Sequence, residues 1–291
     1  MTMASSETLY GAHHFMQREA RLLDRHRFAY HLESGPVAPV RAALEPYRNV
    51  DGGYGNALDP DLRGHGSQPK CTELALRIQD ELGEIPRDSA SHIATYLVSI
   101  SRPDGGVPWV LPTVRHTESA PHWRNAENFG GSLNPTAALA GILHKHHVTH
   151  PWRDHATAFC WERIARMEWT TPDEAQSVCT FLQYVPDQTR AHREFDRIGV
   201  MIRAVFELDP SAVGHVRTPL DLATHPGHVA RRLFSDEEIH THLDALVSAQ
   251  QSDGGWPAHR DSWSHVAQAE WRGIRTLDYL LTLRNYGRLD G

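Results

Sequence analysis

The sequence predicts an all-α protein. Apolar residues recur at helical spacing through much of its 291 residues. No period-two run of β-branched residues persists long enough to indicate a strand. The third observation is an internal repeat, in which an Asp-Gly-Gly turn follows a helix that ends in an apolar pair. Because a repeat at fixed spacing indicates a repeated supersecondary unit, we expect about eleven helices arranged as similar hairpins.

The repeat is clearest at three turns, which begin at Asp51, Asp104 and Asp253. The apolar pairs before them are residues 43–44, 96–97 and 245–246. The third copy is the most complete and has the pattern Q-x-x-x-G-x-W over residues 250–256. The first two turns lie 53 residues apart, and the last follows after 149 more, close to three such intervals. A period of roughly 50 residues predicts about six units.

The expected elements follow in chain order. Pro69 suits the first turn of a helix, where its missing N–H costs nothing. Ser89 or a neighbour is a candidate cap for the next helix. Residues 235–238 have the pattern of a capping box. Residues 54–68, 102–133 and 257–264 are expected to be loops, and residues 210–230 to be irregular with a short helix near the end. The longer helices are expected at residues 6–32, 37–47, 69–82, 89–100, 135–147, 152–168, 173–184, 188–208, 235–250 and 265–285.

The repeat resembles the QW repeat of the terpenoid cyclase and protein prenyltransferase β-subunit superfamily, the squalene–hopene cyclase-like proteins. After two of the turns a loop leads to a helix with threonine near its start, at residues 69–76 and 134–139, as in that family. The resemblance covers most of the chain. It implies one domain over residues 1–291, a single (α/α)6-type toroid with a double ring of about 11–12 helices. It also implies that the loops after the turns lie at one mouth of the toroid, where chemistry is expected.

Composition excludes several classes of protein. A net charge of −7 and an isoelectric point near 6.3 argue against a nucleic-acid binder, which would carry a basic face. The three cysteines are widely spaced and predict neither a disulfide framework nor a zinc ribbon. No apolar run is long enough to span a membrane, and the first residues do not resemble a signal peptide. We therefore expect a cytoplasmic protein with a small-molecule substrate and no nucleic-acid partner; the sequence leaves its oligomeric state open.

The first candidate for catalysis is the loop segment that contains Asp59, Asp61, Arg63 and His65. Two carboxylates two residues apart can raise one another's pKa, so that one stays protonated and serves as a general acid. Arg63 could orient the ionised partner or bind an anionic group of the substrate. The competing interpretation is a solvated turn, because Asp and Pro both favour turns.

The segment departs from the motif of the class II terpene cyclases that it resembles. Those enzymes use Asp-x-Asp-Asp, whereas Leu62 stands at the last position here. Their motif also directly precedes the helix with the threonine, and residues 68–71 occupy that place in this chain. Asp61 is therefore a candidate acid on its chemistry and not by correspondence to the family.

Two glutamates form the second set of candidates. Glu270 stands beside Trp271 at the start of the last predicted helix, and Glu73 follows the threonine of an earlier one. A carboxyl against an indole loses solvation, which raises its pKa. The competing interpretation is an acid in a first helical turn that interacts with the helix dipole.

The remaining candidates are aromatic and polar side chains expected at the mouth. Aromatic faces stabilise cations within about 6 Å, as a carbocation reaction requires, although any one tryptophan can equally belong to the core. Histidines there could act as acids or bases. The candidates for substrate binding, in addition to Arg63 and His65, are Trp109, His116, Trp123, Asn128, Trp263 and Trp271.

No metal or cofactor is expected. The chain has 21 histidines, but none occurs in an HExxH motif or in a Cys/His cluster with zinc spacing. The Asp, Cys and His set that binds zinc in the protein prenyltransferases is not recognisable. A glycine-rich phosphate loop is also absent.

These observations lead to three hypotheses for the function. The first is a terpenoid cyclase-like enzyme that cyclises or isomerises an apolar isoprenoid-type substrate by acid initiation, an inference by analogy of fold. The second is a carbohydrate-active α/α-toroid hydrolase, lyase or epimerase, because paired carboxylates suffice for glycoside hydrolysis. The third is a binding module without catalytic activity, whose mouth docks a partner.

Overall fold

The computed structural model describes residues 2–212, 214, 216–258 and 262–289. These residues form thirteen α-helices and three short 3-10 helices, with isolated β-bridges in place of strands. The prediction of an all-α fold is confirmed. The chain forms two compact units, one made of Met1–Leu44 and Arg203–Gly291 and the other of Glu45–Ile202. The toroid and the single domain over residues 1–291 stay predictions.

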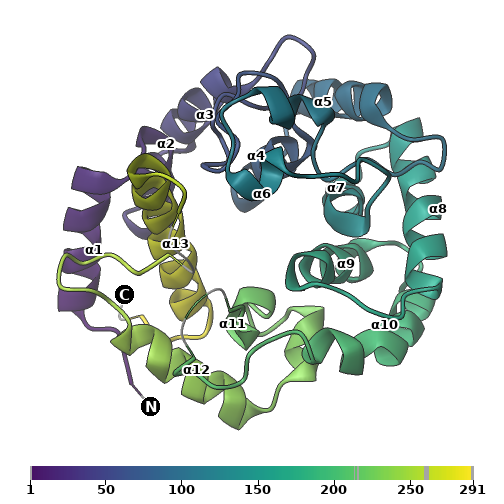
Figure 1. Ribbon diagram of the computed structural model, residues 1–291. Coiled ribbons are helices and arrows are strands. Elements are labelled where there is room, and N and C mark those ends of the chain that lie inside the picture. Colours follow the sequence, from purple (N-terminus) through teal and green to yellow (C-terminus); the bar gives the residue numbers. More distant parts are fainter. Residues whose placement is uncertain (1, 213, 215, 259–261, 290–291) are drawn as a thin grey trace. The chain divides into compact units, whose positions relative to one another are not determined.

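The first unit joins the two ends of the chain. Its long C-terminal helix packs against α1, α2 and α12, and Figure 1 shows it beside the two N-terminal helices. The helices of this unit are α1 (Ser6–Glu19), α2 (Leu22–Leu32), α3 (Val37–Leu44), α11 (Pro219–Leu222), η3 (Val229–Leu233), α12 (Asp236–Ser248) and α13 (His265–Asn285).

The single helix expected over residues 6–32 is in fact two helices. Ala20 and Arg21 have extended backbone conformations, with ψ angles of 154° and 153°, so α1 ends before them and α2 begins after them. Gly273 of α13 lies close to this break, where an added Cβ would be 3.0 Å from the Cβ of Ala20. The break therefore coincides with the close approach of the C-terminal helix, a contact that helical periodicity cannot reveal.

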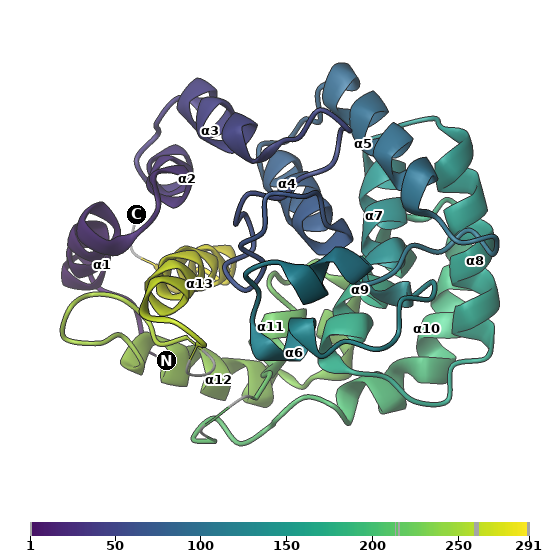
Figure 2. The same cartoon turned by 45° about the horizontal axis from the view of Figure 1, so that its top comes forward.

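The second unit is built around α7. This helix packs against α4, α8 and α9, and α5 packs against α8; Figure 2 shows α4, α5 and α7 in this arrangement. The helices of this unit are η1 (Glu45–Tyr47), α4 (Pro69–Glu81), α5 (Arg87–Ile100), η2 (Pro112–His116), α6 (Pro121–Arg124), α7 (Leu133–Lys145), α8 (Pro151–Ala165), α9 (Pro172–Tyr184) and α10 (Gln188–Arg203), the last residue of which belongs to the first unit.

Several predicted helix ends are confirmed, and two are wrong. The Ser235 hydroxyl accepts from the Glu238 N–H, as in a capping box, and Pro69 stands in the first turn of α4. α5 begins at Arg87 after Pro86, ahead of the predicted cap Ser89. α10 ends at Arg203 instead of residue 208, and the predicted loops at 102–133 and 210–230 contain the short helices named above. Residues 259–261 of the predicted loop at 257–264, and residues 213 and 215, lie outside the described residues.

The three Asp-Gly-Gly turns share one structure. In each, the aspartate carboxylate accepts from the N–H of the second glycine, at 2.9, 3.2 and 3.0 Å for Asp51, Asp104 and Asp253. The first glycine has a φ of 86°, 90° and 92° in the same order, a conformation that favours glycine. The predicted repeat is therefore confirmed at its turns.

Each turn is also attached to a later helix in the same way. The residue after the second glycine donates its N–H to a buried threonine hydroxyl at 2.9–3.1 Å. The second glycine lies against an aromatic ring, where a Cβ would clash. In chain order, the N–H donors are Tyr54, Val107 and Trp256, the threonines are Thr72, Thr136 and Thr276, and the rings are Tyr96, Phe159 and Phe15.

The third copy is completed by the N-terminal helix. The first glycine of each turn packs against the backbone of a neighbouring helix, at His92 of α5, His155 of α8 and Gly11 of α1. α5 and α8 follow their turns in sequence, whereas α1 precedes its turn by more than two hundred residues. The last repeat therefore combines both ends of the chain, within the first unit.

Candidate functional site

The Asp59–Asp61 segment is a tight turn. The Leu62 N–H donates to the Asp59 carbonyl at 2.9 Å, and Pro60 occupies the second position, which suits proline. One carboxylate oxygen of Asp59 accepts from the Asp61 N–H at 2.8 Å. Both aspartates are nevertheless buried, with 3% and 4% of their surface exposed. The segment is thus a turn, but not the solvated turn of the competing interpretation.

The loop that contains these aspartates is attached to the second long loop of the unit. The Asp61 carbonyl accepts from the Ala120 N–H at 2.8 Å, and the Arg63 N–H donates to the Glu118 carbonyl at 2.9 Å. Gln68, just before α4, bonds with both ends of its side chain, to the Leu111 N–H and to the Thr113 hydroxyl, each at 2.8 Å. The two loops therefore form one structural assembly.

An aromatic pair lies one turn beyond the contact with Asp61. The Trp123 N–H donates to the Ala120 carbonyl at 2.9 Å, which starts α6. The indoles of Trp123 and Trp109 meet edge to face, with ring centroids 4.9 Å apart and an interplanar angle of 88°. This is a favourable geometry for aromatic rings. Both indole N–H groups are buried and have no hydrogen-bond partner among the described residues.

The cavity beside this assembly is small. A volume of about 20 Å³ is enclosed by residues of both loops, including Leu62, Gln68 and Ser119. A space of this size holds about one water molecule. A larger open groove of about 580 Å³ lies at the second Asp-Gly-Gly turn, between Val98 of α5 and His155 of α8. None of the residues predicted for catalysis or substrate binding lines that groove.

The backbone just before Asp59 is strained. Asn56 and Ala57 have φ angles of 54° and 65°, which is uncommon for residues other than glycine. The Asn56 amide donates to the Asn49 side chain and to the Pro46 carbonyl, so η1 and the first turn hold this conformation. Strain of this kind costs about 1–3 kcal/mol per residue and persists only where the surroundings enforce it.

The polar candidates of the loops lie at their surface. His65, His116 and Asn128 are exposed, and Arg63 is half-buried. His65 contacts the Asn56 side chain at 3.3 Å, and the Asn128 side chain accepts from the Gly130 N–H at 2.8 Å. These residues belong to the same loop assembly as Asp61, but the structure gives each of them a local partner or solvent.

The raised pKa expected for Glu73 is wrong. Glu73 is buried, and burial alone would raise its pKa, but the charges and hydrogen bonds of Lys70 and Arg77 outweigh burial and lower the pKa to about 2. Its carboxylate lies 2.8 Å from the Lys70 amine and 2.6 Å from the Arg77 guanidinium. Glu73 is therefore an ionised structural partner and not a general acid at neutral pH.

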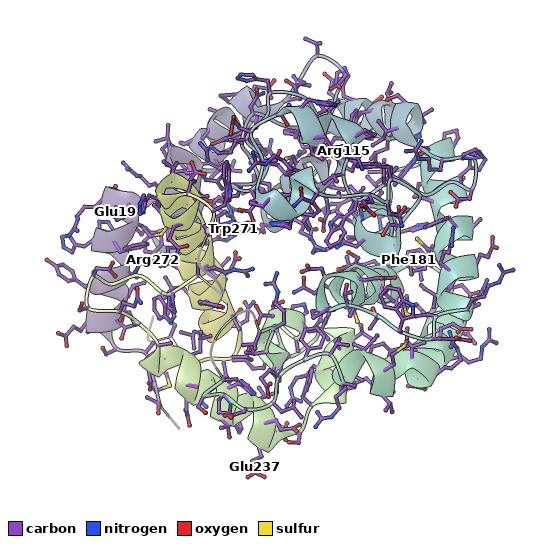
Figure 3. The ribbon with its side chains drawn as sticks, viewed as in Figure 1. Glu19, Arg115, Phe181, Glu237, Trp271 and Arg272 are labelled. Atoms are coloured by element: carbon purple, nitrogen blue, oxygen red, sulfur yellow. The ribbon has the colours of Figure 1, made fainter. Side chains whose placement is uncertain are left out.

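The other three candidates belong to the first unit. Glu270 and Trp271 lie on α13, Trp263 lies just before it, and all three are half-buried. The Arg275 guanidinium lies 5.8 Å from the centre of the Trp271 ring, and Figure 3 shows Trp271 and Arg272 on opposite sides of this helix. None of the three belongs to the loop site of the second unit, and their roles stay predictions.

Sequence reasoning missed two polar residues at helix starts in the second unit. Asn134 is 3% exposed and is the second residue of α7, and Glu174 lies in the first turn of α9. Burial raises the pKa of Glu174. An Asn-Pro pair and a first-turn glutamate are common features of helix starts, so no local signal distinguished these two residues.

The described residues contain no group of three or more His, Cys, Asp or Glu side chains that could hold a metal ion. None of the helices in this part of the chain is both long and apolar enough to cross a membrane.

Comparison with known proteins gives a likeness of fold. No protein-family model matches the chain, and no curated protein matches it. Among solved structures, a protein from Actinoplanes is similar, with 18% sequence identity and a TM-score of 0.57. The match covers 96% of this chain and 88% of the other. At this identity the likeness extends to the fold alone.

Proposed function

We propose that the protein is an enzyme that cyclises or isomerises an isoprenoid-type substrate by protonating it, with Asp61 as the acid. The observation that carries this proposal is the connection between the buried Asp59–Asp61 turn and the Trp109–Trp123 pair through Ala120. A buried carboxyl can deliver a proton to a weakly basic group, and indole faces stabilise the cation that results.

The reaction needs three events. The Asp61 carboxylic acid gives its proton to a carbon–carbon double bond or to an epoxide oxygen, which leaves a carbocation on the substrate and a carboxylate on the enzyme. The cation is attacked by a second double bond of the same substrate, or migrates within it, beside the two indoles. A carbon next to the cation then loses a proton to a base, so the substrate is isomerised with no net change in protons.

Asp59 has a supporting role in this proposal. Its carboxylate accepts from the Asp61 backbone N–H and so holds Asp61 in the turn. It acts on the position of Asp61 and does not contact the reacting atoms.

A second candidate function is favoured by the polar surface of the same loops. His65, His116 and Asn128 are exposed there, and hydroxyl-rich substrates bind through polar side chains of this kind. A carbohydrate-active enzyme would use Asp59 and Asp61 as a carboxylate pair.

The deciding assay uses purified protein with prenyl diphosphates, squalene and oxidosqualene, and separately with a panel of oligosaccharides. We expect turnover of an isoprenoid, and a loss of at least about 10²-fold in Asp61→Asn, the lower end of general-acid effects. Asp59→Asn should lose less, because it keeps the acid. Full activity in both variants removes the pair from the mechanism, and turnover of sugars alone favours the second function. An inactive wild-type protein in both panels contradicts both.

A further inference from the structure

Asn134 holds an open hydrogen-bonding group in the interior of the second unit. Its backbone, with φ −98° and ψ 115°, is not helical, so the regular part of α7 starts at Pro135. The Asn134 side-chain oxygen accepts from the Ser177 hydroxyl of α9 at 3.2 Å. Its Nδ2 is buried and has no partner among the described residues. Exchanging the two ends of the amide would leave the oxygen open instead, so one polar group is unpaired in either orientation.

The first copy of the repeat shows that this is a departure. Asn134 stands two residues before the threonine that accepts from its turn, and Lys70 stands at the same place before Thr72. The Lys70 amine is paired with the Glu73 carboxylate at 2.8 Å. A buried polar group without a partner costs about 1–3 kcal/mol. The open amide of Asn134 is thus a feature that the same scaffold avoids at the comparable place, which points to a ligand.

Glu174 lies on the same face of α9 as the residue that binds Asn134. It precedes Ser177 by three residues, so the two side chains are neighbours on the helix. Glu174 is half-buried, and its carboxyl has no ion pair or hydrogen bond in the part of the chain that the structure describes. Burial without a compensating cation raises the pKa of Glu174. Burial therefore makes its protonated form easier to reach than in an exposed glutamate, and that form donates a hydrogen bond.

The charges around this place balance. α4 contributes Lys70, Glu73 and Arg77, and α9 contributes Asp173. Burial lowers the pKa of Lys70, but the carboxylates of Glu73 and Asp173 outweigh this and raise it, which places Asp173 near Lys70. Residues 133–143 of α7 carry no charged side chain. The two cations, Lys70 and Arg77, are thus balanced by two anions, Glu73 and Asp173. These surroundings favour a neutral ligand over an ionic one. Lys70 and Glu174 are both partly exposed, whereas the Asn134 Nδ2 is buried beneath the surface.

We propose that Asn134 and Glu174 form a binding site for a neutral ligand with an oxygen acceptor, such as a hydroxyl, ether, epoxide or carbonyl group. The Asn134 amide and the Glu174 carboxylic acid donate to that oxygen, and Ser177 holds the amide in place. This site uses none of the residues of the Asp61 turn, and it stands whether or not Asp61 is the acid.

The test measures binding and not turnover. Geraniol and methyl glucoside serve as neutral probes from the two substrate classes, and geranyl diphosphate serves as the ionic counterpart. Dissociation constants are measured by titration calorimetry and ligand-observed NMR at pH 5 and pH 8. We expect a neutral probe to bind, at least tenfold more tightly at pH 5 than at pH 8, because the Glu174 donor is lost when its carboxyl ionises.

Two variants separate the donors. Asn134→Asp replaces the amide donor with an acceptor of the same shape and should weaken binding at least tenfold. Glu174→Gln keeps a donor that does not titrate, so it should bind the probe equally at both pH values. Asp61→Asn, made in parallel, should leave these constants unchanged even if turnover is lost, which distinguishes this site from the proposed active site.

Three outcomes overturn the proposal. In the first, neither neutral probe binds the wild-type protein at either pH. In the second, Asn134→Asp folds, as shown by an unchanged circular dichroism spectrum, and binds normally, so that the amide holds only a buried water. If that variant does not fold, the third outcome decides, because Glu174 is partly exposed and its substitution by Gln should be tolerated. Probe binding by Glu174→Gln that still depends on pH removes Glu174 from the site.

Discussion

The Trp256 N–H donates to the hydroxyl of Thr276 at 3.0 Å, which fastens the third Asp-Gly-Gly turn to the middle of α13. The Trp256 indole donates in turn to the Leu246 carbonyl of α12 at 2.8 Å, and Trp256 and Thr276 are fully buried. The tryptophan of the repeat therefore joins two helices through its backbone and its ring at the same time.

Removing that hydroxyl should destabilise the first unit. Thr276→Val keeps the shape of the side chain but leaves the Trp256 N–H buried without a partner, which costs about 1–3 kcal/mol. Thr276→Ser keeps the hydroxyl and should cost less. Urea unfolding followed by tryptophan fluorescence measures both. Thr276→Val removes only the hydroxyl and Thr276→Ser removes only the methyl group, so a loss in Thr276→Val no larger than in Thr276→Ser would contradict the role of the hydrogen bond.

A side chain on the first glycine of a turn should be poorly tolerated. In Gly254→Ala the new Cβ would overlap the Gly11 carbonyl of α1, and the φ of 92° adds strain. Gly287 also has a positive φ, of 64°, but nothing lies within 4 Å of its added Cβ. Gly287→Ala should cost about 1–2 kcal/mol from the backbone alone, and Gly254→Ala should cost clearly more. Thermal unfolding of the two variants gives this comparison.

The ion pairs of Glu73 predict a loss of stability in strong acid. Its pKa is lowered from 4.5 to about 2 in the folded protein, so the unfolded chain takes up the proton first as the pH falls. The contribution, of about 3 kcal/mol at most, is present above about pH 4.5 and is lost as the pH falls through 2. Urea unfolding at several pH values should show a smaller acid loss in Glu73→Gln. Identical pH profiles would contradict the pairing.

His144 predicts a second loss of stability on acidification, in a pH range above that of Glu73. Burial, assisted by the charge of Arg153, lowers the pKa of His144 from 6.5 to about 4. Between pH 6.5 and 4 the His144 ring therefore binds a proton in the unfolded chain but stays neutral in the folded protein. The free energy of unfolding falls as the pH drops through this range. NMR titration of the ring should give a midpoint near 4. His144→Gln should lack this component of the pH dependence, whereas a substitution at the exposed His240 should retain it.

The two indoles of the candidate site should steer products if a carbocation forms. Trp123→Phe keeps an aromatic face beside Trp109, whereas Trp123→Ala removes it and costs about 3–5 kcal/mol of stability. We expect altered product ratios in the alanine variant and nearly unchanged ratios in the phenylalanine variant, measured by gas chromatography of the reaction products. The exposed Trp169 supplies the control, since Trp169→Ala should change neither the product ratios nor the stability. An unaltered product ratio in a folded Trp123→Ala protein would contradict the cation role.

The sequence by itself determined the features that depend on neighbouring residues. Asp51, Asp104 and Asp253 bond to an N–H two residues away, and the Ser235 capping box closes over three. Such contacts join groups only two or three residues apart, so their patterns can be recognised in the sequence without knowledge of the fold. The repeated turns followed from them, and the all-α class followed from the helical spacing of the apolar residues.

The tertiary structure decided which distant groups complete those turns. The threonine that fixes each turn lies 21 to 32 residues further on, and the helix behind the third turn is α1, from the other end of the chain. Packing also set the charge of Glu73, because Lys70 and Arg77 reverse the effect of its burial on its pKa. Ionisation and orphaned polar groups such as the Asn134 amide depend on what surrounds a side chain in space, and the order of residues specifies those surroundings only through the whole fold.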